Sequence, residues 1–359
     1  MIRAVAMSLG LWVGIATTGM AQAKIGVDDA QRILAPLVEA YGVSSREGPV
    51  REVVQRLLPA WATSETDSAG NLWVRVGAGE PLVVFVAHLD EIGFRVTEIR
   101  EDGQLLLQPA GGFFAALFEA EPALVHTGQS VIPGVFTPVD SAADAGVGLR
   151  VDLGTGSRMA TTALGVEPGA TVTMPKRYVR LAGSRATGRS FDDRVGCAAL
   201  LLALRSLDPK RLRHEVLFVW SVREEIGLEG ARVVADALGG RAARVHAIDT
   251  FVSADAPLEI PTYGLAPLGL GPVVRALDNS AAAPPALVDS VVALARRGGI
   301  PLQVGTTSGG NDGSTFAPWG VPDVALGWPM RYSHSPAETV DLRDVAGLAS
   351  LVRLIAERW

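Results

Sequence analysis

The sequence contains a single cysteine, Cys197, among its 359 residues. One cysteine excludes an internal disulfide and a cluster of thiolate metal ligands. Because Cys197 lies in an apolar helical pattern, we interpret it as a small buried residue rather than a nucleophile. The chain also lacks a basic block and carries a formal net charge of -6, which argues against a nucleic-acid partner.

Low-complexity stretches are missing as well, and the hydrophobic share of 48% is ample for a large core. The length favours two domains over one. The 40 glycines and 22 prolines are typical of a loop-rich α/β protein.

An apolar run of membrane-segment character occurs only near the amino terminus. Residues 4–19 are apolar, Arg3 supplies a positive start, and Ala21-Gln22-Ala23 has the small-x-small pattern of a cleavage site. We therefore expect residues 1–23 to be a signal peptide, cleaved after Ala23, that sends the protein to the periplasm or the medium. The alternative is an uncleaved anchor, but the run is shorter than the roughly 20 residues that span a bilayer. We thus expect no stable membrane insertion after cleavage.

The pattern of apolar residues predicts an interrupted α/β domain with a mixed sheet flanked by helices. Strand-like runs occupy residues 71–76, 82–87 and 92–99, after two amphipathic helical segments. Between residues 97 and 183, short alternating segments are separated by Gly and Pro, which is typical of a small all-β module. After residue 183, helical and strand-like patterns alternate again. We predict a catalytic domain made of residues 24–96 and 184–359, with residues 97–183 inserted.

Potential metal ligands come directly after several strand-like runs. In an open α/β sheet, chemistry gathers beyond the carboxyl ends of the strands, so we expect these side chains to converge. Imidazole and carboxylate groups suit zinc, and also cobalt or manganese. The side chains in question are His88, Glu224, Glu225, Asp249 and His334.

A pair of neighbouring metal ions needs one carboxylate that bridges them and further ligands for each ion. Asp192, at the start of a predicted helix, can bridge. His88 and Asp249 can complete one position, and Glu225 and His334 can complete the other.

Glu224 and Asp90 are candidates for catalytic support. Glu224 stands beside a predicted ligand and can take a proton from an attacking water and return it to a leaving amine. Asp90, two residues after His88, can accept the other imidazole N–H and fix the tautomer of that ring.

Each of these residues also has a simpler explanation. An Asp-Asp-Arg sequence at a helix start, residues 192–194, is commonly a cap with a surface ion pair. Two glutamates after a strand usually lie in a solvated turn, and a single histidine there is usually structural. The combination favours a functional site, because independent solvated residues should not all fall at strand exits. No comparable set of potential ligands accompanies the other three histidines, His126, His214 and His246, and we interpret them as structural.

The motifs resemble those of the tetrahedral aminopeptidases and glutamyl aminopeptidases of the zinc exopeptidase clan. The resemblance runs from about Gly42 to the carboxyl terminus, with the motifs in the same order. Its most specific segments are His88-Leu89-Asp90-Glu91-Ile92-Gly93-Phe94 and Arg331-Tyr332-Ser333-His334-Ser335-Pro336.

This resemblance implies a zinc-exopeptidase-like α/β domain interrupted by a barrel-like dimerisation domain. It implies removal of amino-terminal residues from short peptides with a free N-terminus, with Glu224 as proton shuttle. It also implies a homo-oligomer, either a dimer or a hollow dodecamer. Finally, it implies two divalent metal ions per subunit, zinc before cobalt or manganese, bridged by Asp192 and held by His88, Asp192, Glu225, Asp249 and His334.

Three features depart from the family pattern. Asp193 stands where the family usually has Asn. Asn311 and Gly313 replace Thr or Ser and Ala in the Gly-Gly-x-Asp segment, which leaves the side-chain preference open. The third departure is the predicted signal peptide, since many members of the family are cytosolic and need none.

Three other functions stay open at the level of sequence. A related metallo-exopeptidase or deacylase would act on N-acylated amino acids with similar metal chemistry. A glycosidase would use a carboxylate pair, although His88 and His334 argue against it. A non-catalytic metal- or carbohydrate-binding protein would require a decayed site, whereas every expected ligand and the base are present.

Overall fold

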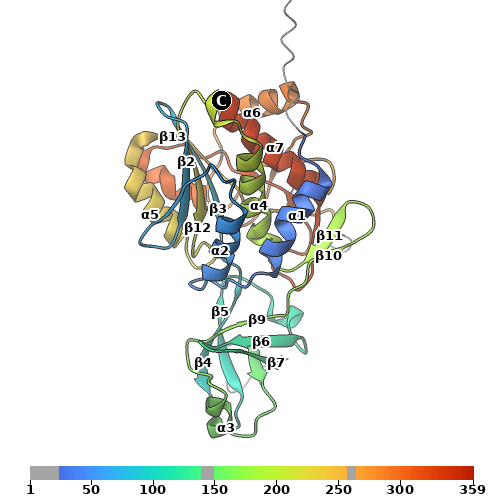
Figure 1. The fold of residues 1–359 in the computed structure, drawn as a ribbon. Coiled ribbons are helices and arrows are strands. Elements are labelled where there is room, and N and C mark those ends of the chain that lie inside the picture. Colours follow the sequence, from blue (N-terminus) through green and yellow to red (C-terminus); the bar gives the residue numbers. More distant parts are fainter. Residues whose placement is uncertain (1–23, 139–148, 257–263) are drawn as a thin grey trace, which may run out of the picture.

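The computed structural model describes residues 24–138, 149–256 and 264–359. The predicted signal peptide, residues 1–23, lies outside the described residues. Figure 1 shows an α/β body above a smaller barrel of strands. No helix in the described ranges combines the length and the apolar character that crossing a membrane requires.

The α/β body is built on a five-stranded mixed sheet, as the sequence predicted. β3 lies between β12 and β13 and runs parallel to both, while β2 is antiparallel to β12. In spatial order the strands are β1 (Ser64–Thr66), β2 (Leu72–Val76), β12 (Val216–Ser221), β3 (Leu82–His88) and β13 (Ala242–Ala247).

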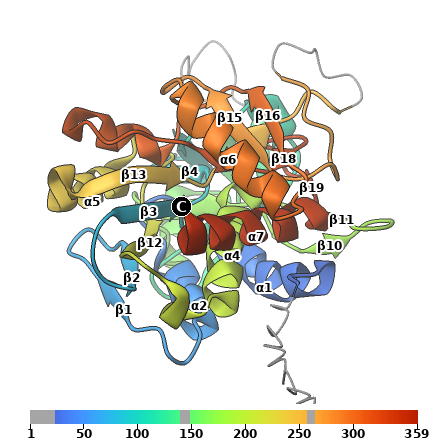
Figure 2. The ribbon, with the colours of Figure 1, turned by 90° about the horizontal axis from the view of Figure 1, so that it is seen from above.

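Helices cover both faces of this sheet, which explains why β3 is buried along its whole length. Val83 and Phe85 point into the larger core, and Val84 and Val86 point into the smaller one, as the two-residue period of a strand requires. The larger core is formed by α1 (Val27–Glu39), α2 (Gly48–Leu57), α4 (Phe191–Ser206), α6 (Pro285–Arg297) and α7 (Leu342–Arg358), and α5 (Glu229–Leu238) covers the opposite face (Figure 2).

Three small sheets complete the α/β body. Apart from the strand-like run that precedes His334, the sequence patterns did not predict them. Their strands are two to five residues long, too short for a clear apolar period. They are β10 (Val179–Arg180), β11 (Arg185–Gly188) and β19 (Glu338–Asp341); β14 (Phe251–Val252) and β18 (Pro329–Met330); and β16 (Gln303–Thr306), β15 (Val273–Leu277) and β17 (Leu326–Gly327). Short 3-10 turns are η2 (Pro209–Arg211), η3 (Gly239–Arg241) and η4 (Asp312–Trp319).

The inserted segment forms a closed six-stranded barrel with its own apolar core, which includes Phe94, Val125 and Phe136. Its strands and short helices are β4 (Gly93–Ile99), β5 (Leu105–Ala110), η1 (Ala115–Leu117), β6 (Pro122–His126), β7 (Val131–Pro138), β8 (Leu149–Asp152), α3 (Arg158–Ala163) and β9 (Thr171–Thr173). The barrel strands thus begin before residue 97 and end well before residue 183. The reason is pairing: β4 pairs with β5 from Gly93 onward, whereas β10 pairs with β11 in the α/β body.

A buried ionic cluster joins the barrel to the α/β body. Glu91, at the exit to the barrel, lies 2.8 Å from Lys176 Nζ, 3.5 Å from Arg194 and 3.6 Å from Arg189. Burial alone would raise the pKa of Glu91, but the charges of Lys176, Arg194 and Arg189 hold this pKa far below its usual 4.5. The fold therefore depends on an ionised carboxylate in its interior.

Replacing Glu91 with Gln should lower the free energy of unfolding by about 3–5 kcal/mol, because buried cations lose their counter-charge. The depressed pKa means that this advantage of the wild type is complete above 4.5 and shrinks as the pH falls below that value. Urea unfolding curves of both proteins at neutral and acidic pH measure the difference.

The matched control is Glu101→Gln, because the Glu101 side chain is 88% exposed and pairs with Arg158 on the barrel surface. This control should change the unfolding free energy by less than about 1 kcal/mol. Equal stability of E91Q and wild type at neutral pH would show that the cluster does not stabilise the fold.

Candidate metal centre

The carboxyl ends of three parallel strands bring the predicted functional residues to one edge of the sheet. β3 ends at His88, which pairs in register with Ser221, the last residue of β12. Glu224 and Glu225 follow β12, and Asp249 follows β13 by two residues. The strand pattern in the sequence therefore placed these side chains at the correct edge.

His88 and Asp192 form the centre of the group. The His88 Nε2 atom lies 3.2 Å from Asp192 Oδ1, while the other Asp192 oxygen, Oδ2, lies 3.4 Å from His334 Nε2. Asp192 sits at the start of α4, where non-helical backbone angles at Asp192 and Asp193 turn its carboxylate toward the strand ends. One carboxylate therefore faces two imidazoles, which is the arrangement expected of a bridging ligand.

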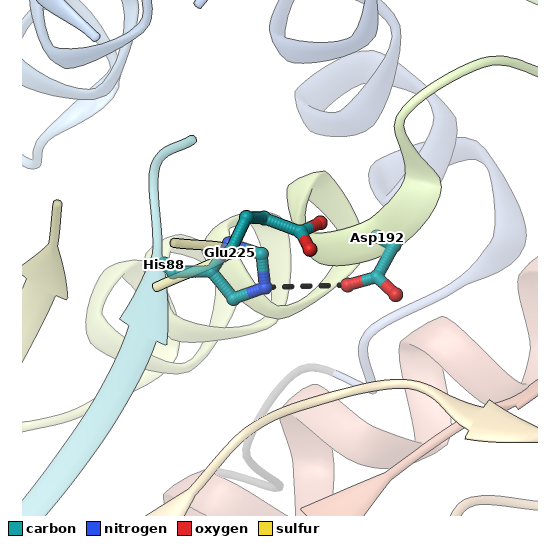
Figure 3. A group of neighbouring side chains, drawn as sticks. All are labelled: His88, Asp192 and Glu225. Atoms are coloured by element: carbon teal, nitrogen blue, oxygen red, sulfur yellow. Dashed lines mark ion pairs between the residues drawn. The ribbon is translucent and has the colours of Figure 1, made fainter. Parts of the chain in front are cut away.

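Glu225 and His334 complete the other side of the group. Their side chains are 3.5 Å apart, measured from Glu225 Oε1 to His334 Nε2. One potential ligand atom each of His88, Asp192 and Glu225 lies within 4.8 Å of the others (Figure 3). His334 has a positive φ of 57°, and its Nδ1 lies 2.5 Å from the Gly112 carbonyl oxygen, which leaves Nε2 for the group.

Glu224 lies at the border of this group, with Oε2 3.9 Å from His88 Nε2. Burial raises the pKa of Glu224 well above its usual range; His88 opposes this shift, and Asp249 adds to it. A carboxyl group with a raised pKa binds a proton more readily than an ordinary glutamate, which suits the role of a proton shuttle.

Asp90 holds the residues around the site rather than only the His88 ring. Its carboxylate accepts hydrogen bonds from the main-chain N–H groups of Glu224 (3.0 Å) and Glu225 (3.2 Å) and from the Ser44 hydroxyl (2.6 Å). The closer acceptor for His88 Nδ1 is the Asp90 carbonyl oxygen at 3.2 Å; the carboxylate lies 3.5 Å away. The sequence pattern predicts the Asp90 carboxylate as the partner of this ring, whereas in the structure the main chain is the nearer partner.

Asp249 is the predicted ligand that lies apart from the tight group. Its Oδ2 is 3.0 Å from Arg275 Nη1, and its Oδ1 accepts the Thr250 N–H at 2.6 Å. Burial raises the pKa of Asp249 to about 7, against the lowering effect of Arg275. Sequence reasoning missed Arg275, because an arginine within an apolar strand gives no local sign of its partner.

Two of the three departures from the family pattern, Asp193 and the Asn311/Gly313 pair, have structural explanations. Asp193 accepts the His88 main-chain N–H and the Gly196 N–H, both at 2.8 Å, so it fixes the start of α4 against the end of β3. Asn311 donates to Asp278 at 2.7 Å. A side chain at Gly313 would place its Cβ 2.3 Å from the Asp323 carboxyl carbon, so alanine does not fit there without a shift.

The residues interpreted as structural lie in ordinary packing environments. His126 contacts Thr173 at 2.7 Å in the barrel, and His246 stacks on Phe85 in the sheet. His214 is buried next to β12. Cys197 is buried beneath the site, its Sγ 3.1 Å from the His88 carbonyl oxygen, and burial raises the pKa of its thiol. A raised thiol pKa argues against a nucleophile.

The donor set fits divalent metal ions. Two imidazoles and several carboxylates converge in a largely buried space. The Nε2 atoms of both imidazoles face carboxylate oxygens of the same group. Such oxygen and nitrogen ligands are typical of zinc, cobalt and manganese sites.

Comparisons with known proteins identify the family of this chain. The family model described as M42 glutamyl aminopeptidase matches residues 70–351. The chain is 30% identical over 336 residues to FrvX of Escherichia coli, covering 89% of this chain and 93% of that protein. It is 29% identical over 346 residues to the lysyl aminopeptidase of Pyrococcus furiosus, covering 90% and 96%.

Its fold is similar to that of the TET1 peptidase of Pyrococcus horikoshii, with a TM-score of 0.83 and 32% identity over 93% of this chain and all (100%) of the other. The likeness extends through the α/β body and the barrel, because it covers nearly the whole chain. The chain therefore belongs to the M42 glutamyl aminopeptidase family, and it is a hydrolase of the aminopeptidase class.

Proposed function

We propose that this protein is an exported, dinuclear metal-dependent aminopeptidase that removes amino-terminal residues from short peptides. The observation that carries the proposal is the position of Asp192 between two imidazoles, 3.2 Å from His88 and 3.4 Å from His334. In this arrangement Asp192 would bridge the two ions, His88 and Asp249 would serve one, and Glu225 and His334 would serve the other.

When bound, the two ions would supply Lewis-acid activation of the scissile carbonyl and lower the pKa of a water molecule. The chain's own contribution is placement and proton transfer. Asp90 holds the main chain of Glu224, and the Glu224 side chain would accept a proton and pass it to the departing amine. The space is largely buried, which strengthens each charge interaction inside it.

Self-association is part of the proposal. The TET1 structure is described as assembling into a tetrahedron or a large octahedral shell. On this chain, the barrel exposes Phe114 (74%), Met159 (81%) and Val131 (51%), a set of apolar side chains that a subunit contact would cover. We propose that the protein forms a homo-oligomer in which barrels meet, with a dimer as the basic unit.

Export is the remaining part of the proposal, and it depends on the charged start, apolar run and small-residue cleavage pattern of residues 1–23. The mature protein would act on peptides in the periplasm or the medium.

Replacing Glu224 with Gln should reduce kcat by about 10²- to 10⁴-fold, because the amide cannot accept and return a proton. Metal content should stay at the wild-type level, since Glu224 is not proposed to bind an ion. Metal analysis and hydrolysis of an aminoacyl-anilide measure the two properties, and Glu98→Gln on the barrel, where Glu98 is 54% exposed, is the control. A metal-loaded E224Q protein with normal turnover would exclude the shuttle role.

Removal of metal with a chelator should abolish hydrolysis of free aminoacyl-anilides, and adding back zinc, cobalt or manganese separately should restore it to different extents. The N-acetylated form of the best anilide should not be cleaved, because the proposed enzyme requires a free amine. Faster cleavage of the acetylated form would favour the deacylase, and chelator-resistant activity on a polysaccharide would favour the glycosidase.

Expression of the full chain in a bacterial host should yield a protein outside the cytoplasm whose first residue is Lys24. Replacing Ala23 with Arg should block cleavage and leave the uncut chain in the cells, whereas Lys24→Arg should be processed normally. Amino-terminal sequencing of both fractions provides the measurement. Wild-type protein that stays in the cytoplasm with residues 1–23 intact would refute export.

A further inference from the structure

Arg275 on β15 is a buried cation at the edge of the metal centre, with only 2% of its surface exposed. Its Nη1 atom lies 3.0 Å from Asp249 Oδ2 and donates to the Thr250 carbonyl at 2.9 Å. Its Nη2 atom lies 3.0 Å from Asp278 Oδ2 and donates to the Gly310 carbonyl at 2.9 Å. The guanidinium is therefore fixed between two carboxylates, only one of which is a candidate ligand.

Asp278 is itself fixed on its far side. Its Oδ2 accepts a hydrogen bond from Asn311 Nδ2 at 2.7 Å, and its Oδ1 accepts the Ser280 main-chain N–H at 2.8 Å. The positive charge of Arg275 is thus shared between Asp249 and a second acid that cannot easily move. Any loss of charge at Asp278 would leave more of this attraction to Asp249.

The two halves of the metal centre differ in this respect. Across residues 24–138, 149–256 and 264–359, the ion pairs of Asp192 and Glu225 are formed with His88 and His334 alone. Asp249 is the candidate ligand that pairs with an arginine. A fixed cation beside a ligand weakens the donation of that ligand and repels a second cation nearby.

On the basis of the dinuclear function proposed above, we propose that Arg275 is a positioning residue that makes the two metal positions unequal. It holds Asp249 in place and at the same time weakens the affinity of the position that Asp249 shares with His88. The position of Glu225 and His334 binds its ion more tightly. Arg275 is not a catalytic residue in this scheme, because it acts through Asp249.

The test is calorimetric titration of the metal-stripped full chain with Zn²⁺ alone, supported by the count of bound Co²⁺ from its absorption spectrum. The wild type should bind two ions in separate steps. Arg275→Met should tighten the weaker step by about ten-fold or more, because a neighbouring positive charge is lost. Asp278→Asn should weaken the same step by about ten-fold, because Arg275 is then attracted to Asp249 alone.

The tighter step should change little in either variant. Arg158→Met is the control, since it removes an arginine that pairs with Glu101 at 2.9 Å on the distant barrel, and it should leave both steps unchanged. A residue that only supports the fold would give weaker binding in both variants, so the opposite signs of R275M and D278N separate the two roles.

Two-step binding by the wild type, with both variants weakened or unaffected, would overturn the role of Arg275 and leave the proposed function intact. A wild type that binds fewer than two ions would overturn the dinuclear function and this inference together. If R275M does not fold, the test rests on D278N. An unchanged Zn²⁺ affinity in the weaker binding step of D278N would then overturn the proposal.

Discussion

The buried carboxylate of Asp90 is the constraint on which the geometry of the site depends. β3 and β12 are held in register as far as His88 and Ser221, where the pairing of the two strands ends. Beyond that point Asp90 accepts the N–H groups of Glu224 and Glu225, so it fixes the distance between the two strand exits. An apolar residue at this position would leave these N–H groups without partners, at a cost of about 1–3 kcal/mol for each that stays buried.

The strand exits could be predicted from sequence because they are marked by a local signal. β3 and β12 are continuous apolar runs that end at polar residues, and a parallel sheet brings such ends together whatever the loops between them do. The barrel was predicted in the same way, from a change in period between residues 97 and 183. The predicted limits of the barrel differ from the observed ones, because residues 92–99 have the pattern of one more strand of the body. Only the pairing of β4 with β5 assigns them to the barrel.

The partners of Asp249 and Asp193 could not be predicted, because they depend on contacts between distant segments. Arg275 pairs with an acid 26 residues earlier in the chain, and nothing in the sequence of β15 distinguishes it from a surface arginine on an edge strand. Asp193 resembled a helix cap in the sequence, and it does accept the Gly196 N–H. Its second acceptor bond, to the main chain of His88, spans 105 residues and appears only in the fold.

The barrel and the metal centre belong to one structural unit because the chain enters and leaves the barrel at the site. β3 ends at His88 and β4 begins at Gly93, and after β9 the chain passes through β10 and β11 of the body to Asp192 at the start of α4. The barrel segment also reaches back to the centre. The Gly112 carbonyl contacts His334, and Gly111, at φ 99°, would bring a Cβ within 3.3 Å of Glu225. A change in the position of the barrel would therefore move Glu225 and His334, two candidate ligands on the same side of Asp192. The buried charges around Glu91 fix this junction.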